Sequence, residues 1–327
     1  MTAAAVLNGG WIYRDRIAGA DAGVALTAWY ADRYRHSDRA CWQQRLAAGE
    51  LHLNGRPAVD DRPLTTGDRL AWHRPPWSEP PVPQHWDVLH DDGDLHVIAK
   101  PAGLPVLPAG GFLEHTILRL LERRWAADPA GVPRPVHRLG RGTSGVLVCA
   151  RSPASRAWLS RLLRDSTATP GTGCRKVYRT LVQPGRLALA VGDELELATP
   201  IGRRPHPHLG QLWCTATPDD PGALAALSHL RLLERRPGAD LAEVTIASGR
   251  PHQIRIHCAA AGAPLLGDPL YGPGGLACAA ALPGDGGYRL HALRVQLQRP
   301  DGTWLVVEAP PPPALAPGTG RGLSGSK

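Results

Sequence analysis

The sequence has little lysine and no long apolar run. Three of its 37 basic residues are lysines (Lys100, Lys176 and Lys327), which leaves 34 arginines. No window reaches the roughly 18 consecutive apolar residues that a membrane-spanning helix needs. The start of the chain also lacks the order of a secretory signal, in which a basic segment precedes an apolar one. These absences predict a cytoplasmic protein without membrane-spanning helices.

The cysteines lack the spacing of a zinc site or a disulfide framework. There are six, no two of them form a Cys-x-x-Cys pair, and we expect reduced, mostly buried thiols. A fixed repeat is also missing, and the hydrophobic content of 43% is normal. Collagen-like, coiled-coil and wholly disordered proteins are therefore excluded.

The positive charge is carried almost entirely by arginine. The formal net charge is +8, and guanidinium groups suit bidentate recognition of phosphate. The chain is also rich in Gly and Pro, so a GC-rich coding bias explains the arginines equally well.

The length of 327 residues favours two folded units, because single cores stop growing at roughly 250–300 residues. In the first unit, residues 1–75, the pattern predicts a short helix capped by Ser37 and ended by Gly49, and then a hairpin turn at Asn54-Gly55. A proline-rich linker over residues 76–87 follows.

The second unit, residues 88–309, mixes strands with helices. Alternating apolar residues predict strands around Val97 and Val244, and Ser152-Pro153 predicts the start of a helix. Because there is no regular βαβ repeat, we expect an α+β fold with a mixed, mainly antiparallel sheet flanked by helices. The tail from Pro310 to Lys327 has almost no core-forming residues, which predicts disorder.

The segment from Gly249 to His257 places basic groups at the expected start of a helix. With Pro251 in the first turn, His252 and Arg255 share a helical face. This arrangement suits either an anion site or a solvated basic helix end. The spacing of His252 and His257 does not suit zinc.

The segment from Val136 to Val148 contains Gly140, Gly142 and Gly145, which spell G-x-G-x-x-G. A dinucleotide site needs a strand before this pattern and a helix after it, whereas a β-rich run follows here. We therefore expect no nucleotide cofactor.

In their order along the chain, these and two further segments resemble the RluA-type pseudouridine synthases. The resemblance covers residues 88 to about 308. It rests on the loop 94–105, the HRLDxxTSG block at 137–145, the Lys-x-Tyr strand at 176–178, the GRTHQIRxH block at 249–257 and the segments 264–272 and 290–292. The first unit resembles the small α/β RNA-binding module of the ribosomal-protein S-four type, through residues such as Arg45, Gly49 and Asn54-Gly55.

The resemblance implies isomerisation of uridine to pseudouridine in ribosomal or transfer RNA, by a monomer that needs no cofactor. It gives Arg138 the task of holding the extruded base, Tyr178 that of stacking on uracil and moving a proton, and Arg255 that of pairing with a catalytic aspartate. The remaining residues of the matched blocks that we expect to contact uridine or RNA are Lys100, His137, Thr143, Arg250, His252 and Gln253.

The match breaks at the aspartate itself. Gly140 stands at the catalytic position, and Gly142 replaces a second frequent aspartate of the block. Three explanations stay open: an inactive RNA-binding homologue, a carboxylate supplied from elsewhere, such as Asp268 or Asp165, or a step that uses water or a substrate group as the base. A buried Arg255 without a carboxylate partner would be costly.

Overall fold

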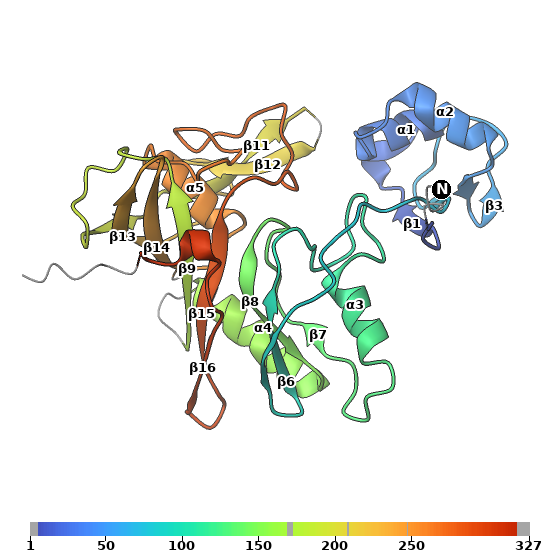
Figure 1. The fold of residues 1–327 in the computed structure, drawn as a ribbon. Coiled ribbons are helices and arrows are strands. Elements are labelled where there is room, and N and C mark those ends of the chain that lie inside the picture. Colours follow the sequence, from blue (N-terminus) through green and yellow to red (C-terminus); the bar gives the residue numbers. More distant parts are fainter. Residues whose placement is uncertain (1–5, 169–172, 208, 247, 319–327) are drawn as a thin grey trace, which may run out of the picture. The chain divides into compact units, whose positions relative to one another are not determined.

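The computed structural model describes residues 6–318 except 169–172, 208 and 247. The chain forms two compact units, one of residues 1–80 with 205–211 and one of residues 81–204 with 212–327 (Figure 1). No helix in the described part of the chain is long and apolar enough to cross a membrane.

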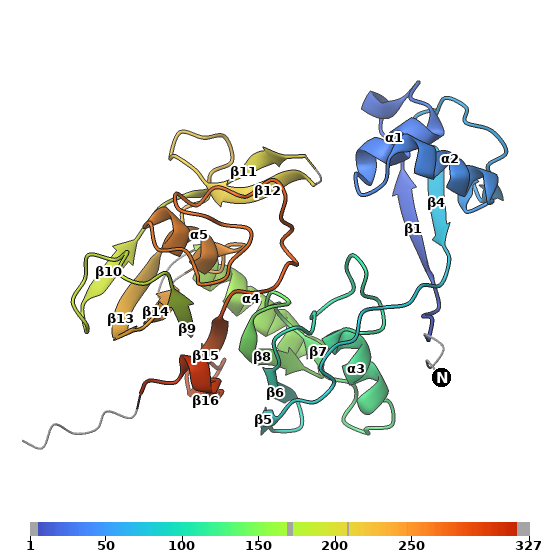
Figure 2. The same ribbon diagram turned by 45° about the horizontal axis from the view of Figure 1, so that its top comes forward.

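The first unit is a four-stranded antiparallel sheet, ordered β1-β4-β2-β3, with two short helices (Figure 2). Its core is aromatic, since the rings of Tyr30 and Trp42 stack at 4.7 Å and Trp72 meets Trp42 edge-on at 4.8 Å. The elements are β1 (Trp11–Arg16), α1 (Leu26–Arg33), α2 (Arg39–Ala47), β2 (Leu51–Leu53), β3 (Arg56–Pro57) and β4 (Arg69–Arg74).

The local turns of this unit follow the sequence closely. Asn54 and Gly55, which join β2 to β3, both have positive φ, 51° and 84°, as a tight hairpin turn requires. The predicted cap of α2 was wrong by one residue. The Asp38 carboxylate, not Ser37, accepts the Cys41 backbone N–H at 2.8 Å, because extended backbone at Asp38 aims its side chain at the first turn.

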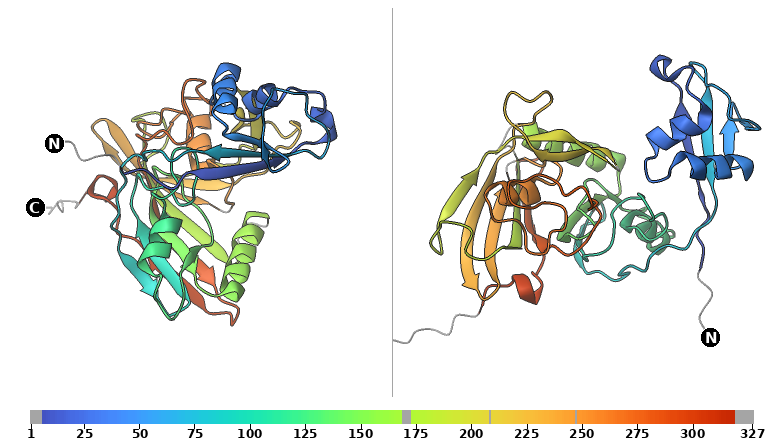
Figure 3. Two further views of the ribbon diagram at one scale, coloured as in Figure 1. Left: turned by 90° about the vertical axis from the view of Figure 1, so that its right-hand side faces the viewer. Right: turned by 90° about the horizontal axis from the view of Figure 1, so that it is seen from above.

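The second unit is built on a ten-stranded sheet whose main path is β10-β13-β14-β9-β15-β8-β6-β5. Among the described residues its pairings are antiparallel except that of β15 with β8, which confirms the expected α+β fold. Figure 3 shows this sheet from two further sides. The longest helix of the unit, α4, packs on β8 and β9.

The strands are β5 (Val88–Asp91), β6 (Leu95–Lys100), β7 (Arg134–Pro135), β8 (Ser144–Ala150), β9 (Cys174–Val182), β10 (Glu194–Leu197), β13 (Ser228–Arg236), β14 (Ala239–Ile246), β15 (Leu290–Gln298) and β16 (Trp304–Glu308). The helices are α3 (Ile117–Arg124), α4 (Pro153–Ala168) and α5 (Gln253–Ala260), and a separate hairpin consists of β11 (Ile201–His206) and β12 (Gly210–Thr215).

The parallel pairing joins the glycine-rich loop to β15. Gly145 lies opposite Ala292 with φ +105°, and a β-carbon at Gly145 would lie 2.1 Å from the Ala292 carbonyl oxygen. Only glycine fits such an approach. Because strand β8 follows the loop, the structure excludes the strand-turn-helix geometry of a dinucleotide site.

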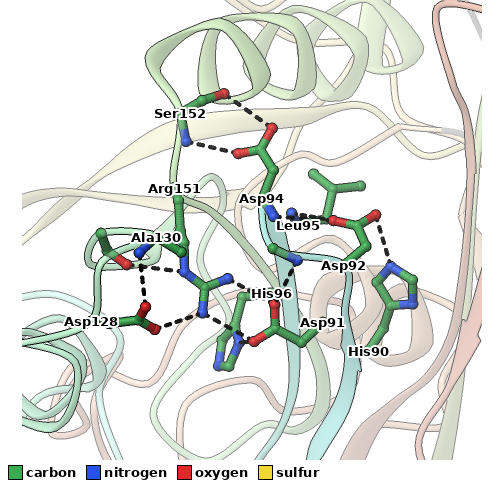
Figure 4. A network of polar contacts seen from close by, with 12 residues as sticks. His90, Asp91, Asp92, Asp94, Leu95, His96, Asp128, Ala130, Arg151 and Ser152 are labelled. Carbon is green, nitrogen blue, oxygen red and sulfur yellow. Dashed lines mark hydrogen bonds and ion pairs between the residues drawn. The ribbon is translucent and has the colours of Figure 1, made fainter.

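A polar network fixes the β5–β6 turn to the start of α4 (Figure 4). Arg151 donates to both carboxylate oxygens of Asp91, at 2.8 and 3.0 Å, and this pairing lowers the pKa of Asp91 well below its usual range. The Asp94 carboxylate accepts the Ser152 N–H at 2.8 Å, and the Ser152 hydroxyl in turn caps α4 by accepting the Ser155 N–H. The predicted cap at Ser152 is thereby confirmed.

The expected disorder after Pro310 was wrong for residues 310–318. The side chain of Leu315 is 3% exposed and packs with Leu181 and Leu241, while Arg236 donates to the Ala316 carbonyl. One leucine is enough to anchor this segment, because an apolar recess of the sheet receives it. Residues 319–327 lie outside the described residues.

Candidate functional site

The glycine-rich loop connects β7 to β8. The Thr143 backbone N–H donates to the Gly140 carbonyl at 3.0 Å and closes a turn. Arg138 and Gly140 are exposed, whereas the Thr143 side chain is buried. The loop therefore presents Arg138 to solvent, where a side chain that holds an extruded base has to be.

Arg255 has a carboxylate partner, although position 140 offers none. From the first turn of α5, its Nε and Nη2 each donate to an oxygen of Asp268 at 2.7 Å. Both side chains are buried, with 4% and 0% exposure. Asp268 also accepts the backbone N–H groups of Leu270 and Tyr271. The second candidate, Asp165, is 59% exposed on α4 and its carboxylate lies 3.9 Å from Arg164.

Two tyrosine rings flank the Arg255 guanidinium. Its central carbon lies 4.3 Å from the ring centroid of Tyr288 and 5.1 Å from that of Tyr271. The nitrogen edge of the guanidinium hydrogen-bonds to Asp268, and its faces make cation–π contacts with the two rings. Arginine commonly combines these two kinds of contact.

Tyr288 lies against Gly140 and Gly142, the two positions at which the resemblance implies aspartates. A β-carbon placed on Gly140 would be 2.8 Å from the Tyr288 hydroxyl oxygen, and one on Gly142 would be 3.0 Å from a ring carbon of Tyr288. The hydroxyl is 3.5 Å from Oγ1 of Thr143. The absence of side chains at both glycines is what admits the tyrosine ring.

The expected helical position of Pro251 was wrong. Helix α5 begins at Gln253, and His252 is its N-cap with a left-handed φ of 56°. Tyr271 donates its hydroxyl proton to the Trp213 carbonyl at 2.7 Å, so Nδ1 of His252, 2.7 Å from the same hydroxyl, is the donor to it. Burial, reinforced by Arg255, lowers the pKa of His252 to about 4, and the imidazole is neutral at pH 7.

Gln253 and Arg250, both expected to touch RNA, are bonded within the protein. The Gln253 side-chain oxygen accepts from the Ser248 hydroxyl and the Arg250 N–H, and its amide nitrogen donates to Leu227 and Ser228. The Arg250 Nε donates to the Ala225 carbonyl at 3.0 Å. These contacts set the path of the chain into α5 and thereby position Arg255.

His137 and Lys100 also bond to backbone groups of the protein. Nε2 of His137 accepts the Val148 N–H at 3.0 Å, and burial lowers the pKa of this histidine to about 3. Lys100 is 1% exposed, and its Nζ donates to the carbonyls of Pro101 and Arg141 at 2.7 and 3.3 Å. Lys100 thereby holds the glycine-rich loop at Arg141, and His137 ties the start of that loop to β8.

Lys100 predicts a pH dependence of stability. Burial lowers its pKa from 10.5 to about 7, so between these values the folded protein binds fewer protons than the unfolded chain and the free energy of unfolding rises with pH. Lys100→Met removes this contribution. Between pH 7 and 9.5, the free energy of unfolding of wild type, measured with urea, should rise by about 3 kcal/mol more than that of Lys100→Met. Parallel stability curves for the two proteins would contradict the assignment.

Tyr178 lies on β9, opposite Val244 on one side and Ala292 on the other. Its ring packs against two core clusters, one that contains Leu139 and one that contains Tyr288. Burial raises the pKa of its hydroxyl, which is therefore protonated at neutral pH. The structure thus brings Tyr178 to the same region as the glycine-rich loop and Tyr288.

Sequence reasoning missed Tyr288 and Arg141. The Arg141 Nε donates to the Gly284 carbonyl at 2.9 Å and so ties the glycine-rich loop to the segment that carries Tyr288. Thr143 and Tyr288 are 145 positions apart in the sequence, so no local pattern announces their contact. A tyrosine just before the matched segment 290–292 was the available signal.

Comparisons with known proteins agree with this architecture. The family described as RNA pseudouridylate synthase matches residues 94–260, just over half of the chain. An uncharacterised RNA pseudouridine synthase of Synechocystis is 42% identical, over 88% of this chain and 94% of its own length. RNA pseudouridine synthase 5 of Arabidopsis thaliana is 34% identical, over 94% and 95%. The human RNA pseudouridylate synthase domain containing 1 shares the fold, with a TM-score of 0.53 at 20% identity, over 73% of this chain and 89% of its own.

The fold and the matched blocks define an RNA-modifying enzyme of the isomerase class. The chain belongs to the RNA pseudouridylate synthase family, in its RluA-type branch, as the sequence segments predicted. The reaction of this family converts uridine in RNA to pseudouridine.

Proposed function

We propose that this chain isomerises uridine in ribosomal or transfer RNA at a site formed by the glycine-rich loop, Tyr178 and Arg255. The observation that carries the proposal is the buried pair of Arg255 with Asp268. A buried guanidinium is costly without a carboxylate, and here one is supplied although Gly140 offers none. Arg138, exposed on the loop, holds the extruded base.

The proposal needs no cofactor, because the bonds broken and formed belong to one substrate. Among the described residues, no group of three or more His, Cys, Asp or Glu side chains is placed to hold a metal ion. We further propose that the protein acts as a monomer in the cytoplasm.

RNA binding by the first unit is part of this proposal. A hollow of about 590 Å³ on that unit is lined by Trp11, Arg14, His73 and other residues. The Trp11 side chain is 43% exposed and offers a face on which a base can stack, while Arg14 is exposed beside it for a phosphate. These features support an S-four-like module that holds the RNA flanking the target uridine.

A second candidate is a catalytically inactive RNA-binding homologue. It is favoured by Gly140, which supplies neither nucleophile nor base, and by the Tyr288 hydroxyl, which lies 2.8 Å from the position of a β-carbon at residue 140. Both candidates predict RNA affinity that falls with salt, with a slope near −0.7 per phosphate on single strands. Affinity indifferent to salt would contradict both.

Tritium release separates the two candidates. RNA labelled at C5 of uridine loses tritium when that carbon becomes the glycosidic carbon, so we expect the wild-type protein to release label from ribosomal or transfer RNA. Absence of release from every cellular RNA, together with release by Gly140→Asp alone or combined with Tyr288→Phe, would show that the wild-type protein is an inactive homologue.

A further inference from the structure

The hydroxyl of Tyr288 is the nearest atom, outside the adjacent residues, to a β-carbon placed on Gly140, where the side chain of the family's aspartate would begin. It lies 2.8 Å from a β-carbon placed on Gly140, a separation comparable to that between a carboxylate oxygen and its own β-carbon in aspartate. The ring is 5% exposed, but Gly140 beside its hydroxyl is exposed to solvent. A substrate that reaches Gly140 therefore reaches this hydroxyl.

The hydroxyl has a poor partner within the protein. Its one hydrogen bond among the described residues is to Oγ1 of Thr143, at 3.5 Å, which is the long limit for such a bond. Buried tyrosine hydroxyls normally find a good partner. The ring of Tyr288 is thus held in place, while its hydroxyl oxygen can still form a hydrogen bond or a covalent bond with a ligand.

The surroundings fix the position of the Tyr288 ring. The Arg255 guanidinium lies 4.3 Å from the ring centroid, and its nitrogen edge is held by Asp268. Tyrosine is an established nucleophile at anomeric carbons, as sialidases show.

We propose that Tyr288 replaces the family's aspartate as the catalytic nucleophile, attacking C1′ of the target uridine. This inference rests on the proposed function. In this account the tyrosine oxygen takes the place of the aspartate oxygen. The lack of side chains at Gly140 and Gly142 leaves the space that the tyrosine needs.

The step balances within the substrate. The phenol gives its proton to water, and the phenolate oxygen bonds to C1′ as the C1′–N1 bond breaks, with its electron pair going to N1. The uracil turns, C5 bonds to C1′, and the bond from C1′ to the tyrosine oxygen breaks and returns its electron pair to that oxygen, which takes its proton back from water. C5 loses a proton and N1 gains one, so no oxidant, reductant or cofactor is consumed.

The test is single-turnover tritium release by Tyr288→Phe, which keeps the ring over Arg255 and removes one oxygen atom. We expect a loss of about 10³-fold or more, as for removal of other catalytic nucleophiles. RNA affinity and melting temperature should stay at the wild-type values. The matched control is Ser166→Ala, which removes another buried hydroxyl of the same unit, one that donates to Leu163 within α4; its rate should equal that of wild type.

A double variant gives a second readout. Apart from the hydroxyl, no atom of Tyr288 lies within 4 Å of a β-carbon at Gly140, so Tyr288→Phe removes the closest contact of the first atom of an aspartate side chain there. We expect Gly140→Asp to raise the rate of Tyr288→Phe by about tenfold or more and not to raise that of wild type.

Two outcomes separate this inference from the proposed function. A Tyr288→Phe rate within about threefold of wild type overturns the assignment of Tyr288 and leaves the proposed function standing. A wild-type protein that turns over no RNA overturns both.

Discussion

Asp268→Asn is expected to lower the free energy of unfolding by about 3–5 kcal/mol, the usual cost of breaking a buried ion pair by removing one partner. The amide keeps the size of the carboxylate but leaves the Arg255 guanidinium, whose side chain is 4% exposed, without a counter-charge. Urea unfolding at pH 7 measures the loss as a lower midpoint at an unchanged slope.

Two controls separate charge from packing in that experiment. Asp165→Asn removes a carboxylate that is 59% exposed, and we expect a change below about 0.5 kcal/mol. The double variant Arg255→Met, Asp268→Leu removes both charges, so it should cost less than Asp268→Asn alone. A loss below about 1 kcal/mol for Asp268→Asn would contradict the role of the ion pair.

Gly145→Ala is expected to be comparably severe, at about 3–5 kcal/mol, because steric overlap and backbone strain combine. The new methyl group would lie 2.1 Å from the Ala292 carbonyl oxygen, at the parallel pairing of β8 with β15, and φ is +105°. Relief requires β8 and β15 to separate. Chemical denaturation and the yield of soluble protein measure the effect.

Gly222→Ala is the matched control for that substitution. Gly222 also has positive φ, +75°, but no atom lies within 4 Å of the added carbon. It therefore reports backbone strain alone, and we expect a loss of about 1 kcal/mol. Equal losses in the free energy of unfolding for the two variants would show that the close approach of β8 to β15 does not restrict the size of the side chain at residue 145.

The sequence predicted the features of the fold that depend on neighbouring residues. The turn at Asn54-Gly55, the cap at Ser152 and the strand after the glycine-rich loop are all present. The start of α5 was misjudged because Pro251 suits a first helical turn in isolation. In the structure, the Gln253 side chain accepts the Arg250 N–H, which tightens the turn so that the helix begins only after His252.

The candidate site was predictable only in part. Asp268 was one of two carboxylates proposed from the sequence as a substitute, and the structure places it on Arg255, whereas Asp165 points to solvent on α4. Tyr288 could not be found, because its contacts with the glycine-rich loop depend on how distant segments meet. A motif alone also cannot show that Lys100 is 1% exposed or that His137 accepts a backbone N–H of β8.

The most direct measurement is a crystal structure of the protein bound to an RNA that carries the target uridine with a non-reacting sugar. Our account predicts the Tyr288 hydroxyl oxygen in contact with C1′, next to Gly140, with Arg255 still paired to Asp268. A complex in which Tyr288 has turned away from the sugar, or in which Asp268 has left Arg255 to face C1′, would contradict it.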